Sequence, residues 1–208
     1  MLPEVDVLVE WPKNPEIYEA PRFSLSLGRV VIEPGGIALG VVAVMLVAFA
    51  EFTSSGLWSL LARSFATMCA AQLLATAVHE FSHAAIARGY GFTVDHIRIG
   101  VGGAVEWYPA SSQAPTRQLR NVVAAGPASH LPLVLVGLVG LGLVPWTSAW
   151  FLPLCAFTGL NLALAVQNFF PTTIGKDDWP WLGGFNGHPT DGMIIRRLGH
   201  LRADGGSL

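Results

Sequence analysis

One long apolar run of the sequence has two histidines and a glutamate near its end: Phe65-Ala-Thr-Met-Cys-Ala-Ala-Gln-Leu-Leu-Ala-Thr-Ala-Val-His-Glu-Phe-Ser-His-Ala-Ala-Ile-Ala87. A helix needs about 20 apolar residues to cross a hydrocarbon core of about 30 Å, and this run is long enough. Ionisable side chains are costly at that depth, so those that occur there usually serve a function. The run therefore predicts a membrane-spanning helix that carries a polar site towards its C-terminal end.

Three further apolar segments have the length of membrane spans or come close to it. They run from about Ile37 to Phe52, from Val122 to Val144 and from Trp146 to Phe170. Charged residues make up only 12% of the chain and hydrophobic residues 52%, whereas soluble domains carry about twice that share of charge. We therefore predict an all-α polytopic membrane protein with about four transmembrane helices. A net charge of −2 gives no field that would attract nucleic acid.

The segment between the second and third spans differs from the rest, because short runs of strand-forming residues alternate there with glycines. Val94-Asp-His-Ile-Arg-Ile99 and Ala104-Val-Glu-Trp-Tyr108 flank the bend Gly100-Val-Gly-Gly103. This pattern predicts a small β-rich segment that is associated with the membrane.

The first 34 residues are polar and interrupted by prolines, and they lack the basic start and apolar core of a signal peptide. Phe23-Ser-Leu-Ser-Leu27 alternates like a strand, which the run from Gly28 to Ile32 could continue. We expect residues 1–34 to form a cytoplasmic segment with a possible strand. Residues 35–197 would form the membrane core, and residues 198–208 a cytoplasmic tail.

The orientation in the membrane follows from the basic residues. If the N-terminus is cytoplasmic, only Arg63 of the 12 Lys and Arg residues falls in an outer loop. Cytoplasmic loops are enriched in Lys and Arg, so this distribution predicts that both termini are cytoplasmic. We expect a multi-pass protein of the plasma membrane of a prokaryote.

The five residues His79-Glu-Phe-Ser-His83 match the pattern HExxH. Residues i and i+4 share one face of a helix, so the two imidazoles can bind one metal ion. Glu80 is then placed to accept a proton from a water molecule that the metal activates. The alternative is a polar cluster that only joins packed helices.

A catalytic zinc ion has three protein ligands and leaves its fourth position to water. For the third ligand we choose Asp191 in Pro189-Thr-Asp-Gly192, although Asp-Gly is also a common turn. Asp177, Asp178 and His188 lie in the same stretch after the fourth span and are alternatives.

Two asparagines and a third histidine lie in the later spans. Asn168 closes the fourth span in Asn168-Phe-Phe-Pro171, where its amide could orient a peptide carbonyl or stabilise an oxyanion. A helix-end hydrogen bond is the alternative role for Asn168. Asn161 could bind a neighbouring helix, so we leave it out of the predicted site. We interpret His130 as a helix-packing residue, with an accessory polar role as the alternative.

Taken together, these patterns resemble the site-2 protease family of intramembrane metalloproteases. Three matches occur in the family's order, and they cover roughly Gly35 to Arg197. They are His79-Glu-Phe-Ser-His83-Ala84, then Ala125-Gly-Pro-Ala128, and then Asn168-Phe-Phe-Pro171 followed by Asp191-Gly192.

The resemblance implies particular roles for the matched residues. It implies a zinc site made by His79, His83 and Asp191, with Glu80 as the catalytic base. It also implies that the neighbourhood of Gly102 and Gly103 binds substrate, as a sheet edge to which an unwound segment adds as a strand.

Two features depart from the family pattern. Ile174 to His188 looks like an insertion between the Asn-x-x-Pro and Asp-Gly motifs, and it is rich in Trp and Gly. His130 stands where the family often has asparagine.

We therefore predict an intramembrane zinc metalloendopeptidase with one catalytic Zn²⁺, which hydrolyses peptide bonds in or near transmembrane segments. Its expected partners are the lipid bilayer and a membrane-protein substrate, and no pattern indicates its oligomeric state. One alternative is a catalytically inactive adaptor of the same fold, which the presence of Glu80 disfavours. A metal transporter is a weaker alternative, because no second polar cluster is visible across the four spans.

Overall fold

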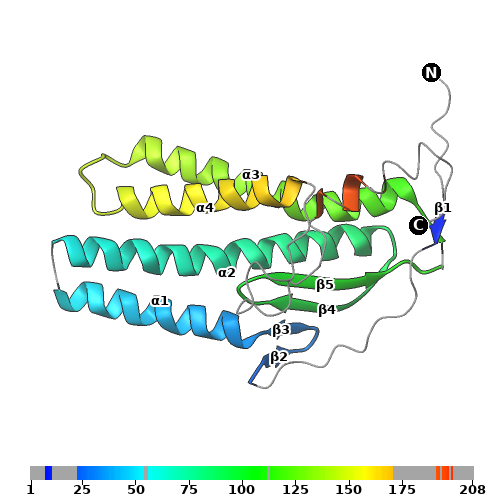
Figure 1. Cartoon of the computed structure of the whole chain (residues 1–208), viewed down its shortest axis with the longest axis horizontal. Coiled ribbons are helices and arrows are strands. Elements are labelled where there is room, and N and C mark those ends of the chain that lie inside the picture. Colours follow the sequence, from blue (N-terminus) through cyan, green and yellow to red (C-terminus); the bar gives the residue numbers. More distant parts are fainter. Residues whose placement is uncertain are drawn as a thin grey trace.

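The computed structural model describes residues 8–10, 23–53, 56–111, 113–170, 191–192, 194–196 and 198. Its four long helices are α1 (Pro34–Thr53), α2 (Leu57–Gly89), α3 (Thr116–Leu143) and α4 (Phe151–Phe169). Each is long and apolar enough to cross a membrane. Figure 1 shows them as two antiparallel pairs, α1 with α2 and α3 with α4, stacked along their length. The predicted multi-pass helical membrane protein with a small sheet between its second and third spans is confirmed.

Three helices begin five or more residues away from the starts read from the sequence, and α3 is one of them, because it begins at Thr116 rather than Val122. α2 begins at Leu57 rather than Phe65, and it therefore includes the charged residue Arg63, which the apolar run in the sequence left out. Arg63 Nη2 lies 3.2 Å from Glu51 Oε1 near the end of α1, so the two charges pair. α4 begins at Phe151 rather than Trp146, because the chain turns after Pro145 before the helix starts.

The sheet has four strands in the order β2-β3-β4-β5, with bounds Leu25–Leu27, Val30–Ile32, Thr93–Ile99 and Gly103–Tyr108. β3 and β4 are parallel and the other two pairs are antiparallel. The strand expected to run on through Gly28 is instead a hairpin, because Gly28 adopts a φ of 64° that suits a tight turn. A separate two-stranded ladder joins β1 (Leu8–Glu10) to β6 (Gln113–Pro115).

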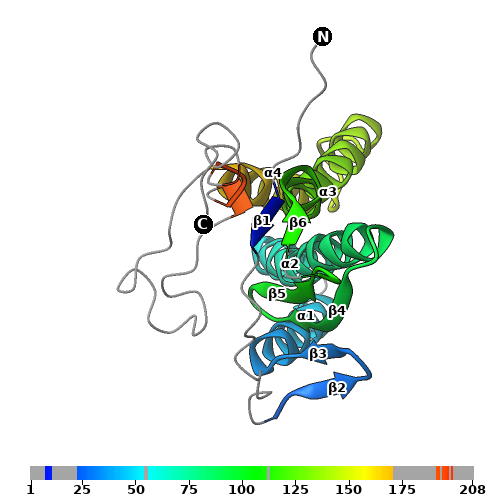
Figure 2. The ribbon, with the colours of Figure 1, turned by 90° about the vertical axis from the view of Figure 1, so that its right-hand side faces the viewer.

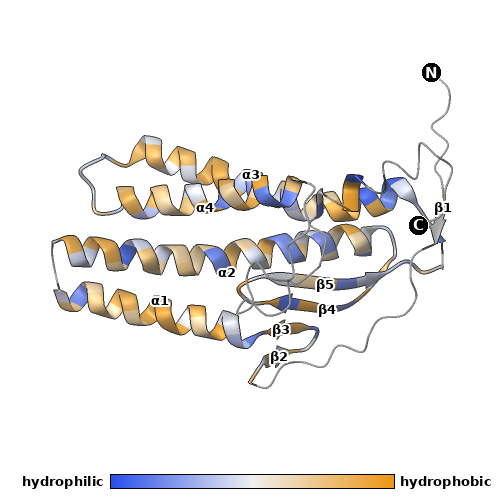
Figure 3. Ribbon diagram, viewed as in Figure 1, coloured by the Kyte–Doolittle hydropathy of each residue, from blue (hydrophilic) through white to orange (hydrophobic). Residues whose placement is uncertain are grey.

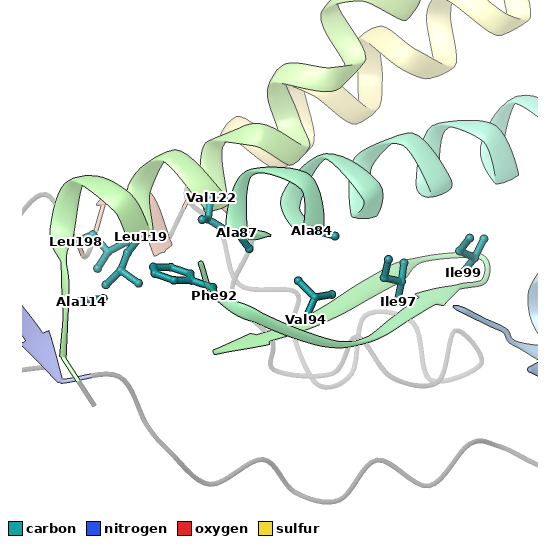
Figure 4. Packing of buried hydrophobic residues seen from close by; sticks show 10 residues of the cluster. All are labelled: Ala84, Ala87, Phe92, Val94, Ile97, Ile99, Ala114, Leu119, Val122 and Leu198. Carbon is teal, nitrogen blue, oxygen red and sulfur yellow. The ribbon is translucent and has the colours of Figure 1, made fainter. Parts of the chain in front are cut away.

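Helix α2 is the centre of the molecule. Figure 2 shows it between the α3–α4 pair and the sheet. Val94, Ile97 and Ile99 of β4 are buried against Ala84 and Ala87 of α2, as Figure 4 shows. The alanines let the sheet approach the helix closely, and burial of the larger apolar side chains holds it there.

The turn between β4 and β5 lies beside the start of α1 and the middle of α2. Gln72 Nε2 donates a hydrogen bond to the Val101 carbonyl at 2.7 Å. The Glu33 backbone N–H donates to the Ile99 carbonyl at 2.8 Å, and Arg98 Nε donates to Glu33 Oε1 at 2.7 Å. Figure 3 shows that α1 is mostly apolar, whereas α2 carries hydrophilic patches where it runs beside the sheet. This contact places the start of β5 against the HExxH segment.

Candidate metal centre

Three potential ligand atoms meet at the side of α2. His79 Nε2 and His83 Nε2 are 3.1 Å apart, and Asp191 Oδ2 lies 3.0 Å from the first and 3.4 Å from the second. Both histidines are buried. With bonds of about 2.0–2.1 Å, two ligands of a tetrahedral zinc ion lie about 3.3–3.4 Å apart. The three atoms therefore have nearly the spacing that such an ion requires.

The outer nitrogens of the two histidines fix which ring atom faces the centre. His83 Nδ1 lies 2.7 Å from the Val122 carbonyl oxygen. A carbonyl oxygen can only accept, so Nδ1 carries the hydrogen and Nε2 of the neutral ring has a free lone pair. His79 is arranged in the same sense, with Nδ1 directed at His130 Nε2 over 3.1 Å.

The three converging atoms are all electron-pair donors, so a positive charge between them would stabilise the arrangement. Two imidazole lone pairs and a carboxylate oxygen repel one another at these distances unless a proton or cation lies between them. A single divalent cation satisfies all three at once, and histidine with carboxylate is a common ligand set of zinc. His79, His83 and Asp191 could therefore hold a metal ion.

Asp191 reaches this centre from the far end of the chain. The following residue, Gly192, packs so closely on the end of α4 that an added Cβ would collide with the Phe169 carbonyl oxygen. The aspartate is thus placed by backbone contact with α4.

Glu80 lies between the metal-ligand face of α2 and the sheet. It is buried, and a Cβ added to Gly103 would come within 2.5 Å of Glu80 Oε1 and 2.7 Å of Thr76 Cγ2. β5 therefore begins directly against the carboxylate, which only a glycine permits. Gly102 lies in the preceding turn and accepts a hydrogen bond from the Gly100 N–H at 2.8 Å.

The structure thus brings together His79, His83 and Asp191, with Glu80 beside them. Asn168 lies in the last turn of α4, and no hydrogen bond joins it to these side chains among the described residues. The rival ligands Asp177, Asp178 and His188, with the rest of the Ile174–His188 segment, lie outside the described part of the chain.

Sequence reasoning left three residues of α3 and α4 out of the predicted site, although they touch or support the centre. A Cβ at Gly126 would collide with Nε2 of both His79 and His83, so the α3 backbone closes one side of the site. His130 contacts His79, and Asn161 contacts His130. The available signal was the spacing of Gly126 and His130, which are four residues apart and therefore share a face of α3.

Comparisons with known proteins agree with this architecture. No family model matches the chain, and no curated protein matches it. Among solved structures, the chain is similar to the site-2 protease from Methanocaldococcus jannaschii, with a TM-score of 0.53 and 19% identity. The match covers 88% of this chain and 74% of that chain. At this identity the similarity establishes the fold, and the chemistry has to be argued from the residues. The chain therefore has a site-2-protease-like fold.

Proposed function

We propose that this protein is an intramembrane zinc metalloendopeptidase that hydrolyses peptide bonds in or near the transmembrane segments of other membrane proteins. The observation that carries the proposal is the convergence of His79, His83 and Asp191 beside the buried Glu80. The site-2-protease-like fold supports it.

In this mechanism the chain's residues hold the ion, move a proton and orient the substrate. Zinc, when bound by His79, His83 and Asp191, supplies Lewis acidity and activates a water molecule. Glu80 accepts a proton from the water as the water oxygen attacks the scissile carbonyl carbon. When the C–N bond breaks, Glu80 gives that proton to the leaving amine. We assign to Asn168 the role of orienting the carbonyl oxygen, because it lies in the α4 turn against which Gly192 packs.

The substrate would be bound along β5. Among the described strands, β5 stands at the edge of its sheet, and it begins against Glu80. An extended peptide can add to such an edge through backbone hydrogen bonds. A substrate helix must unwind to do this, so residues that weaken helices should favour cleavage.

The depth of the site supports a cytoplasmic position for the chemistry. From Leu57 to His79 along α2 the rise is about 33 Å at about 1.5 Å per residue, close to the hydrocarbon thickness of about 30 Å. If α2 starts at the outer boundary, the HExxH segment lies near the inner one, where water is available. We propose this orientation in the plasma membrane of a prokaryote, with both termini cytoplasmic, because it also places the basic residues inside.

The decisive test is Glu80→Gln in the detergent-purified protein. We expect zinc content to stay at the wild-type level, because Glu80 is not a ligand, while cleavage falls by about 10²–10⁴-fold. The assay uses single-span proteins that carry Gly, Asn or Pro in the span, with products read by mass spectrometry. Ser82→Ala is the matched control, because Ser82 lies on the same helix and its hydroxyl donates a hydrogen bond to the Val78 carbonyl of that helix.

Two results would favour other functions. Equal behaviour of Glu80→Gln and wild type in binding single-span proteins, with no cleavage by either, would indicate an adaptor. Zinc flux into vesicles that is lost in His79→Ala would indicate a transporter.

A further inference from the structure

A line of buried polar side chains runs from the metal centre through the helix bundle. His79 Nδ1 on α2 lies 3.1 Å from His130 Nε2 on α3, and His130 Nδ1 lies 3.5 Å from Asn161 Oδ1 on α4. His130 is 1% exposed and Asn161 is fully buried. Three helices are thus joined by polar contacts in a region where an unpaired polar group would be costly.

The far end of this line sets the direction of its hydrogen bonds. Asn161 Nδ2 donates to the Phe157 carbonyl one helical turn earlier, at 2.9 Å. This bond fixes the amide so that Oδ1, which can only accept, faces His130. His130 Nδ1 must therefore carry a hydrogen, and in the neutral ring its Nε2 is an acceptor.

The tautomer of His130 in turn sets the tautomer of His79. His130 Nε2 accepts the hydrogen of His79 Nδ1, so the lone pair of His79 is on Nε2. That atom faces His83 and Asp191. Reversing Asn161 would cost its bond to Phe157 and would place an N–H donor against the N–H of His130. Only one arrangement satisfies every group, and it presents the metal-binding nitrogen.

We propose that His130 and Asn161 are positioning residues that hold His79 in the tautomer and ring orientation required for metal binding. This inference rests on the proposed zinc site. Histidine ligands of metals commonly donate their second ring N–H to an acceptor that orients them, and loss of that acceptor costs about 10–100-fold in metal affinity. Here the acceptor is a second imidazole whose own tautomer is set by an amide one helix further away.

The test measures zinc affinity by chelator competition in the full-length protein in detergent. His130→Ala should bind zinc about 10–100-fold more weakly than wild type. His130→Gln should recover most of the loss, because its side-chain oxygen can take the acceptor position of Nε2. The zinc affinity of Asn161→Ala should lie between those of His130→Ala and His130→Gln. Thr158→Ala is the matched control, since Thr158 is also buried on α4 and bonds a carbonyl one turn earlier, at Leu154.

A second measurement separates orientation from general destabilisation. The visible absorption of the Co²⁺-substituted protein reports ligand geometry, and it should change in His130→Ala and return towards wild type in His130→Gln. If His130→Ala does not fold, the comparison of His130→Gln with Asn161→Ala carries the test.

The outcomes distinguish this inference from the function on which it rests. Zinc bound by wild type and lost in His79→Ala supports the site itself. With that established, unchanged affinity and Co²⁺ spectra in folded His130→Ala and Asn161→Ala would overturn the positioning role alone. A folded wild type that binds no zinc would overturn both.

Discussion

Among the described residues, two groups of histidine and carboxylate side chains have ligand atoms within 4.8 Å of one another, and the two groups differ in burial and in how their rings are held. One is His79, His83 and Asp191, and the other is Asp95, His96 and Glu106. In the second group the side chains of His96 and Asp95 are 36% and 55% exposed, and His96 Nδ1 lies 3.5 Å and 3.8 Å from its two carboxylate neighbours. In the first, the outer nitrogens of both histidines are held by buried partners. We therefore expect metal binding at the first group, because burial and fixed ring orientation prepare its ligand atoms for an ion, whereas exposed acidic groups are common without one.

The two groups also arise from different features of the backbone. The second comes from a β-bulge, because the register shifts between Val94 and Ile97 so that Asp95 and His96 both lie opposite Glu106. The first combines helical spacing on α2 with a carboxylate from the end of the chain. A bulge can gather polar side chains on a solvated face at little cost, whereas a buried cluster persists only if its charges are satisfied.

The largest effect is expected where the backbone of α3 closes one side of the site formed by His79, His83 and Asp191. In Gly126→Ala the new methyl group collides with both metal-facing nitrogens. We expect zinc affinity to fall by at least about 100-fold, at the upper end for disturbed support of a metal ligand, and cleavage to be lost. Alanine is favoured over glycine in a helix by up to about 1 kcal/mol, so a weaker α3 would not be the cause. Gly142→Ala, also on α3 but with nothing within 4 Å of the added Cβ, is the control. Wild-type zinc affinity in folded Gly126→Ala would show that α3 does not press on the histidines.

An intermediate effect should follow from Gly103→Ala, which disturbs the site from the sheet side. The added methyl group would push β5 away from Glu80 and Thr76. Displacement of a reacting group by about 1 Å can cost about 100-fold in rate, so we expect cleavage to fall by about 10–100-fold with zinc affinity unchanged. Gly89→Ala, at an open position, should leave both quantities as in wild type. Equal loss of zinc and activity in Gly103→Ala would contradict the separation of the two roles.

The smallest effect is expected at the second group. His96→Ala combined with Glu106→Gln should change zinc content and cleavage by less than about twofold, because partly exposed ion pairs contribute little to the fold and exposed acidic groups are common without an ion. Metal analysis of both proteins is the measurement. A fall from two bound ions per chain to one would mean that this second group is a metal site after all, and the comparison would fail.

Sequence reasoning reached the parts of this molecule that depend on local spacing. The four apolar runs and the i, i+4 pair His79 and His83 need only the geometry of one helix. The contact between His79 and His130 depends on the register of α3 against α2, which short-range patterns do not encode. The same is true of Gly103 against Glu80, and of β3, which pairs with β4 only after the chain has passed through α1 and α2. Asp191 was chosen with Asp177, Asp178 and His188 left as alternatives, because nothing near it in the sequence separates a ligand from a turn.

The position of the HExxH segment so far along α2 has a consequence for the choice of lipid. In a bilayer with longer acyl chains the hydrocarbon would extend over the metal centre, and in one with shorter chains it would end before it. When the apolar length of a helix and the thickness of the bilayer differ, the helix tilts or the surrounding bilayer deforms, at a modest free-energy cost per ångström of difference. In the proposed orientation, access of water to the centre would therefore depend on acyl-chain length, and vesicles of different thickness would set different rates for the same protein.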